Sequence, residues 1–137
     1  MFKEFKGAVF AVVALVLIVG GVSVRADEFT KEDVERWQDE YMSVVAQGRE
    51  LWVSADLGTN GVACAQCHPN GANTHPETYP KFQRQLGRVV SLFEMVNWCL
   101  QNPLEGEPLA ADDPKMVALL SYITYERRGV PLAPGKH

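Results

Sequence analysis

Cysteine and histidine are scarce in this sequence of 137 residues, which contains three of each. Three cysteines cannot form two Cys-x-x-Cys pairs, which argues against the kind of structural zinc site that uses two such pairs. Basic residues are also outnumbered: 13 Lys or Arg stand against 17 Asp or Glu, for a net charge of −4. This balance argues against nucleic acid or anionic lipid as a ligand. No internal repeat, low-complexity segment or strand pattern occurs, so we expect a single globular domain built from helices.

The N-terminus has the pattern of an export signal. Two lysines in the first six residues precede an uncharged apolar run over residues 7–21, and small residues follow up to Ala26. A helix needs about 20 apolar residues to span a bilayer, so this run suits a signal peptide better than a membrane anchor. We predict a cleaved signal peptide over residues 1–26 and one exported, periplasmic domain over residues 27–137. An uncleaved signal that tethers the chain to the membrane is the alternative.

The most informative stretch is Cys64-Ala65-Gln66-Cys67-His68. Two cysteines two residues apart and followed at once by histidine can form thioethers to a haem, with the histidine as axial iron ligand. Zinc would need further ligands, and a redox-active cysteine pair would not need the adjacent histidine. We therefore predict one covalent haem c held by Cys64, Cys67 and His68. We expect the second ring nitrogen of His68 to donate to a loop carbonyl downstream.

The ligand on the opposite side of the iron is less clearly specified, and four residues are candidates. Met116 lies on the apolar stripe of the last predicted helix, and Met95 shares a helix face with Cys99, so we expect both to pack in the core. His75 follows His68 by only seven residues and suits a loop. Cys99 is the cysteine left over once the haem has taken two, so it is our preferred ligand. A reactive thiol, an intermolecular disulfide and simple core packing remain alternatives for Cys99.

Spacing and capping residues predict the helices. Apolar residues at intervals of three, four and seven indicate a helix from Lys31 to about Ser54, which Gly48 could divide in two. A capping box at Ser91 and Glu94 starts a helix that Pro103 stops, and Asp113-Pro114 starts a last helix that stops at Gly129. We also expect a short helix over residues 81–88 and a frayed tail over residues 130–137.

Six segments within about residues 45 to 128 carry a family resemblance: Gly48-Arg49-Glu50-Leu51-Trp52, Asn60-Gly61-Val62, Tyr79-Pro80-Lys81-Phe82, Val96-Asn97-Trp98-Cys99, Gly106-Glu107-Pro108-Leu109 and Leu119-Leu120-Ser121-Tyr122-Ile123. They resemble class I cytochromes c, and more narrowly the N-terminal haem domain of thiosulfate dehydrogenases. A weaker likeness reaches the haem subunit of thiosulfate-oxidising sulfur cytochromes.

The resemblance implies an all-α, class I-like cytochrome fold around one haem c with His68 and Cys99 as its iron ligands. In those families the cysteine also lies where thiosulfate reacts, so the likeness makes Cys99 a candidate catalytic residue. This chain departs from them in having one haem motif instead of two, and in carrying Leu100-Gln101-Asn102-Pro103 after the cysteine.

Three functions are compatible with these features. We expect a carrier or subunit that transfers single electrons to or from another cytochrome or a dehydrogenase, in the oxidation of sulfur compounds. The alternative is an enzyme like thiosulfate dehydrogenase, which would bind a sulfur oxyanion and react at Cys99 with a separate electron-accepting partner. A sensor with a displaceable iron ligand is the third.

Overall fold

The computed structural model describes residues 29–137, and the predicted signal peptide over residues 1–26 lies outside this range. The described part is mostly helical, as predicted, with one two-stranded sheet. No helix within it is long and apolar enough to cross a membrane. In chain order the elements are α2 (Lys31–Val53), α3 (Cys64–Cys67), the 3₁₀ turns η1 (Pro69–Gly71) and η2 (Pro76–Thr78), β1 (Lys81–Gln83), β2 (Arg88–Val90), α4 (Leu92–Gln101) and α5 (Pro114–Glu126).

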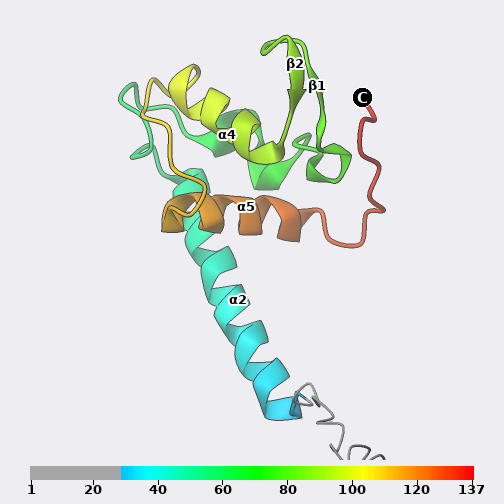
Figure 1. Cartoon of the computed structure of the whole chain (residues 1–137). Helices are drawn as coiled ribbons and strands as arrows, with labels where there is room; N and C mark the ends of the chain where they lie inside the picture. Colours follow the sequence, from blue (N-terminus) through cyan, green and yellow to red (C-terminus); the bar gives the residue numbers. More distant parts are fainter. Residues whose placement is uncertain (1–28) are drawn as a thin grey trace, which may run out of the picture. The chain divides into compact units, whose positions relative to one another are not determined.

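Helices α2 and α5 cross near the C-terminal end of α2 (Figure 1). The crossing is close because Gly48 lies buried at the contact, where a Cβ atom would collide with the Ala118 carbonyl and with Cβ of Tyr122. Helix α2 therefore runs unbroken through Gly48, and the division that the sequence suggested does not occur. At this position glycine permits a tight helix contact and does not end a helix.

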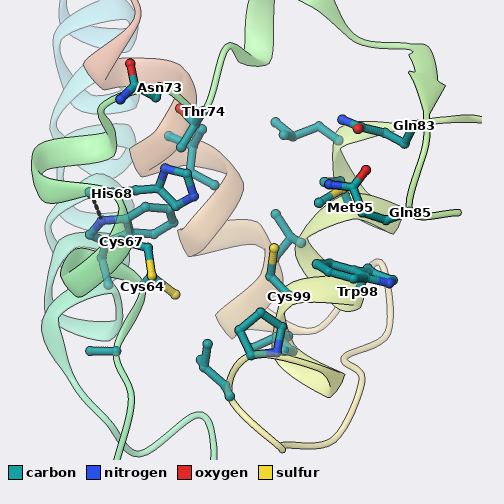
Figure 2. A pocket seen from close by; sticks show the side chains of 18 of the residues that line it. Cys64, Cys67, His68, Asn73, Thr74, Gln83, Gln85, Met95, Trp98 and Cys99 are labelled. Carbon is teal, nitrogen blue, oxygen red and sulfur yellow. Dashed lines mark hydrogen bonds between the residues drawn. The ribbon is translucent and has the colours of Figure 1, made fainter.

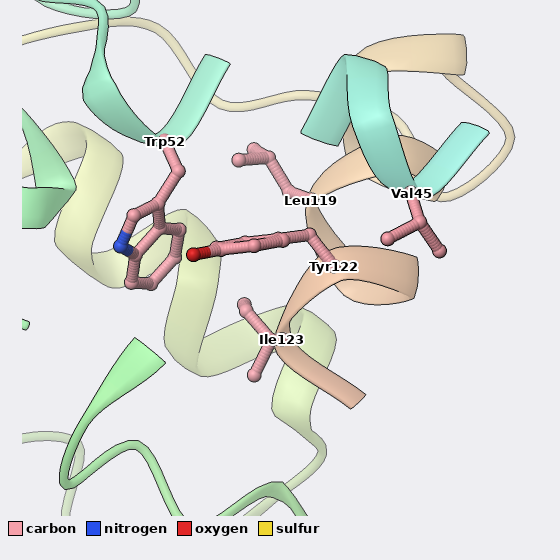
Figure 3. Packing of buried hydrophobic residues seen from close by; sticks show 5 residues of the cluster. All are labelled: Val45, Trp52, Leu119, Tyr122 and Ile123. Carbon is pink, nitrogen blue, oxygen red and sulfur yellow. The ribbon is translucent and has the colours of Figure 1, made fainter. Parts of the chain in front are cut away.

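The core is built on this crossing. Figure 3 shows Val45 and Trp52 of α2 facing Leu119, Tyr122 and Ile123 of α5. The rings of Trp52 and Tyr122 lie with centroids 5.7 Å apart at an interplanar angle of 55°, a tilted arrangement that aromatic pairs favour. A second cluster joins Leu100 and Leu104 to Met116 of α5, which is fully buried. The apolar stripe predicted for the last helix is thus confirmed.

The predicted starts of the last two helices are confirmed. Ser91 Oγ accepts a hydrogen bond from the Glu94 amide, and Glu94 Oε2 accepts one from the Ser91 amide at 2.7 Å, so the predicted capping box starts α4. Asp113 Oδ1 accepts from the Lys115 amide at 2.8 Å and starts α5. Helix α5 ends at Glu126, before the predicted stop at Gly129.

The helix expected over residues 81–88 is wrong, because this segment forms a β-hairpin. Strands β1 and β2 pair antiparallel, with Phe82 opposite Val89. Two features favour the hairpin over a helix: Val89 and Val90 are β-branched, and Gly87 takes a φ of 66° that suits glycine in the turn. The Gly87 amide closes the turn by donating to the Gln83 carbonyl at 2.8 Å.

The C-terminal tail is ordered rather than frayed. The Ala133 amide donates to the Glu77 carbonyl at 2.8 Å, and the Gly135 amide donates to the carbonyls of Thr78 and Pro80 at 2.9 and 3.0 Å. The tail therefore lies along the loop that leads into the hairpin. Our expectation of a frayed end failed because it relied on composition and position in the chain, which do not reveal such backbone pairing.

The helix crossing can be tested with Gly48→Ala. Helix propensity alone would make this change stabilising by about 1 kcal/mol. We expect it to lower the free energy of unfolding by about 1–3 kcal/mol instead, because the new methyl group overpacks the contact with Ala118. Urea unfolding measures the difference. Gln47→Ala at the exposed neighbouring position should change stability by less than about 0.5 kcal/mol, and a stabilised Gly48→Ala variant would contradict the close crossing.

Candidate functional site

A pocket of about 360 Å³ lies between α3, the hairpin and α4. Its volume is within the range of small-molecule and cofactor sites, roughly 300–1,000 Å³. Apolar residues from α4 and α5 form much of its wall, and the turn α3 brings Cys64 and Cys67 to one side (Figure 2). Both cysteines are free thiols, Cys64 partly buried and Cys67 exposed. Burial raises the pKa of Cys64 to about 11, with nearby Cys99 adding to the effect.

His68 follows α3 directly, and its ring points into the pocket (Figure 2). Its Nδ1 lies 2.8 Å from the Ala72 carbonyl oxygen. Because a carbonyl can only accept, Nδ1 carries the proton and Nε2 keeps a lone pair for a metal. The predicted bond from His68 to a downstream carbonyl is therefore confirmed. Trp52 Nε1 donates to the His68 carbonyl at 2.9 Å, which attaches the motif to the core.

Cys99 projects from α4 on the opposite side of the pocket, with its sulfur facing the space in front of His68 (Figure 2). Burial raises the pKa of the Cys99 thiol, and the neighbouring Cys67 contributes repulsion. Met95 also lines the pocket, one helical turn before Cys99, so the prediction that it packs in the core is wrong. The fold thus brings the three residues of the motif together with two of the four candidates for the second ligand.

The other two candidates lie elsewhere. Met116 is packed with Leu100 and Leu104 and does not line the pocket. His75 belongs to the loop before η2, where its Nδ1 lies 3.0 Å from Glu77 Oε1. Both positions agree with the packing and loop interpretations that the sequence favoured.

The polar rim of the pocket was not predicted. Lys81, Gln83 and Gln85 reach the pocket from the hairpin, and Tyr79 accepts a hydrogen bond from Gln83 Nε2 at 2.6 Å. We missed these residues because the segment was assigned to a helix. The alternation of Lys81, Phe82 and Gln83, followed by the two valines of β2, was the available signal.

The pocket fits a c-type haem. The thiols of Cys64 and Cys67 lie on one wall beside the imidazole of His68, whose Nε2 is available. The thiol of Cys99 and the thioether of Met95 lie on the opposite wall, and apolar side chains line most of the remaining pocket surface. A haem requires this donor set together with an apolar surrounding. Within residues 29–137 no group of three or more Cys, His, Asp or Glu side chains is arranged to bind a metal ion directly. Fold and pocket together define a c-type cytochrome domain.

Comparison with known proteins identifies the family. A family profile described as "SoxA/TsdA, cytochrome c domain" matches residues 47–132, so the chain belongs to the SoxA/TsdA cytochrome c domain family. It is 30% identical over 89 residues to a thiosulfate dehydrogenase of Allochromatium vinosum, covering 56% of this chain and 33% of that protein. It is 27% identical over 119 residues to the SoxA subunit of L-cysteine S-thiosulfotransferase from Rhodovulum sulfidophilum, covering 85% of this chain and 41% of that protein.

A solved structure agrees with these matches. The fold resembles that of SoxXA from P. pantotrophus with a TM-score of 0.65 at 25% identity, over 75% of this chain and 40% of that one. The predicted cytochrome fold, family resemblance and cofactor are therefore confirmed, and the domain carries one covalently bound haem c. The chain spans about two fifths or less of the length of these relatives.

A partly buried ion pair supports the loop beside the pocket. Glu77 is only 8% exposed, and its Oε1 accepts from Arg127 Nη2 at 2.9 Å and lies 3.0 Å from Nδ1 of His75. The hydrogen bond from Arg127 is the main reason that the pKa of Glu77 falls to about 2, and the contact with His75 adds to it. Arg127 follows α5, so the pair joins the end of that helix to the loop.

The Glu77 pair makes stability depend on pH. A carboxylate whose pKa is lowered by folding stabilises the fold above its unfolded pKa of about 4.5, and this contribution disappears as pH falls toward 2. We expect Glu77→Gln to have a lower urea midpoint than the wild type at pH 7, with the gap narrowing between pH 4.5 and 2. Glu107→Gln, at an exposed position, is the control. A difference in urea midpoint that does not change with pH would mean that the charge of Glu77 does not contribute to stability.

Proposed function

We propose that this chain is an exported, periplasmic cytochrome that transfers one electron at a time in the oxidation of sulfur compounds. One domain over residues 27–137 holds the haem, and cleavage after Ala26 releases it from the signal peptide. The partner is a second redox protein, such as another cytochrome. The proposal is supported by membership of the SoxA/TsdA family and by the SoxXA complex among its structural neighbours.

In this proposal Cys64 and Cys67 form the thioethers and His68 and Cys99 are the iron ligands, with Met95 as the alternative to Cys99. The observation that carries the assignment is the position of Cys99 across the pocket from His68 (Figure 2). The haem supplies a one-electron iron couple whose potential a thiolate ligand lowers relative to a methionine ligand. Met116 lies in the core and is not part of the proposed site.

The chain's own residues orient the cofactor and exclude water. The Ala72 carbonyl fixes the ring of His68, and Trp52 restrains the backbone on which that ring is mounted. Second-shell hydrogen bonds of this kind set both the tautomer and the ring orientation of a histidine that binds a metal. On the other side, Asn97 ties α4 to the following loop through two bonds of 2.9 Å with the backbone of Leu109, which holds Cys99 in place.

An enzymatic function at Cys99 is the competing candidate. Two relatives are named for thiosulfate chemistry, thiosulfate dehydrogenase and L-cysteine S-thiosulfotransferase, but those names describe proteins of which this chain covers 33% and 41%. Such an enzyme would bind a sulfur oxyanion near Cys99 and would need a separate acceptor for the electrons. A turnover experiment separates the two functions.

The sixth ligand is tested by spectroscopy of the oxidised holoprotein. We expect low-temperature EPR and near-infrared magnetic circular dichroism to show a low-spin iron with histidine and thiolate ligands. Cys99→Ala should abolish the thiolate signature because no other thiol remains free once the haem is attached. Met95→Leu should leave it intact. A methionine-to-iron band in the wild type, lost in Met95→Leu, would contradict the assignment of Cys99.

Turnover of thiosulfate with an artificial electron acceptor distinguishes carrier from enzyme. For a carrier, we expect the wild type to consume thiosulfate no faster than Cys99→Ala, while both accept electrons from a chemical reductant. A rate at least about tenfold above Cys99→Ala, a loss of about 1.4 kcal/mol in transition-state stabilisation, would support the enzyme instead. Failure of the wild-type haem to cycle reversibly between its two states would contradict both functions.

A further inference from the structure

The β-hairpin combines an exposed apolar pair with a local excess of positive charge. Phe82 and Val89 stand opposite each other across the two strands, and they are 46% and 61% exposed. Lys81, Arg84 and Arg88 lie on the same hairpin, and no acidic residue occurs between Glu77 and Glu94. This is unexpected in a chain whose net charge is −4.

The positive charges remain available to a partner. Arg84 is exposed and forms no ion pair within the described part of the chain. Arg88 contacts Glu94 at 2.6 Å, yet its side chain is still 56% exposed. Lys81 Nζ lies 4.7 Å from the centre of the Tyr79 ring. Because cross-strand partners share a face, Phe82 and Val89 lie on the outer face of the hairpin, while Lys81 and Arg88 lie on the face turned toward the pocket and α4.

The hairpin is also a wall of the haem pocket. Lys81 and Gln83 of β1 line the pocket, and Gln85 of the turn joins them, while Phe82 is exposed beside them on the same strand. Figure 1 shows the hairpin projecting beyond α4, away from the crossing of α2 and α5. A protein seated on Phe82 and Val89 would therefore lie directly against the structure that encloses the cofactor.

We propose that the outer face of the hairpin, formed by Phe82 and Val89 with Arg84 at the adjoining turn, is the docking site for an acidic electron-transfer protein. The inference rests on the proposed electron-transfer function and specifies the chemistry of the partner. An apolar patch of the partner covers Phe82 and Val89, and its carboxylates face Arg84. Lys81 and Arg88, on the other face of the hairpin, add to the local positive field. Redox partners of this kind bind through small, transient interfaces, generally below about 1,200 Å², which suits a surface as small as one hairpin.

The rest of the chain makes the assignment specific. The first half of α2 is acidic, with Glu32, Asp33, Glu35, Asp39 and Glu40 within ten residues. An acidic partner guided by net charge alone would be repelled by the whole molecule. It would be attracted only by a local field at the hairpin, and screening would weaken that attraction as salt rises.

Charge reversal on the hairpin tests the docking site. The probe is a reduced plant-type [2Fe–2S] ferredoxin, an acidic protein that gives one electron to the ferric haem and is itself oxidised. Stopped-flow measurements at about 10 mM and about 0.5 M ionic strength give the second-order rate constant. We expect Arg84→Glu to slow the reaction about tenfold at low salt and hardly at all at high salt, since screening removes the steering.

The control is Lys136→Glu, which makes the same change in net charge at an exposed position of the tail. It should slow the reaction less than twofold. Equal slowing by both variants would mean that only net charge matters and would overturn the proposal, as would an unaffected Arg84→Glu. Arg84→Gln should give an intermediate rate, which excludes a folding defect as the cause of the slowing.

Two further measurements separate the possible failures. With both proteins oxidised, so that no electron moves, isothermal titration calorimetry should show binding that Arg84→Glu weakens by a similar factor. Reduction by the uncharged, strongly reducing deazariboflavin radical should be the same in all variants, and a wild type that this radical cannot reduce would instead contradict the electron-transfer function. Wild-type self-association that Phe82→Ser abolishes would assign the surface to a second copy of the chain and overturn the proposal.

Discussion

The close crossing of α2 and α5 at Gly48 is the contact on which the rest of the structure depends. It sets the distance between the two helices, and one turn further along α2 it places Trp52 against Tyr122. From there the indole reaches the carbonyl of His68. Gly48 thus acts on the position of His68 through two residues, Tyr122 and Trp52.

The two walls of the pocket are built in different ways. The wall with Cys64, Cys67 and His68 is local, since its turn and its bond to Ala72 all lie within nine residues. The wall with Cys99 belongs to α4, whose placement depends on Leu100 packing against Met116 and on Asn97 binding Leu109. Substitutions at Met116 should therefore disturb the Cys99 side of the pocket more than the His68 side.

This difference explains how far the sequence was predictive. The capping box at Ser91, the N-cap at Asp113 and the bond from His68 to a downstream carbonyl follow from short-range rules, and the structure contains each of them. The hairpin was missed because Lys81 to Arg88 has no decisive local pattern, and its pairing is visible only when Phe82 meets Val89. The role of Gly48 could not be recognised without its partner Ala118, which lies seventy residues away. For the second iron ligand, the sequence offered four candidates and favoured Cys99. The fold places Cys99 and Met95 in the pocket and Met116 and His75 outside it.

The hydrogen bonds of the C-terminal tail bear on where the folding unit ends. The family match stops at residue 132, but the amides of Ala133 and Gly135 supply donors to three carbonyls between Glu77 and Pro80. A chain shortened to the matched region would leave those carbonyls to water and release the loop that leads into the hairpin. The backbone contacts of the domain therefore extend beyond the region matched by the family, as far as Gly135.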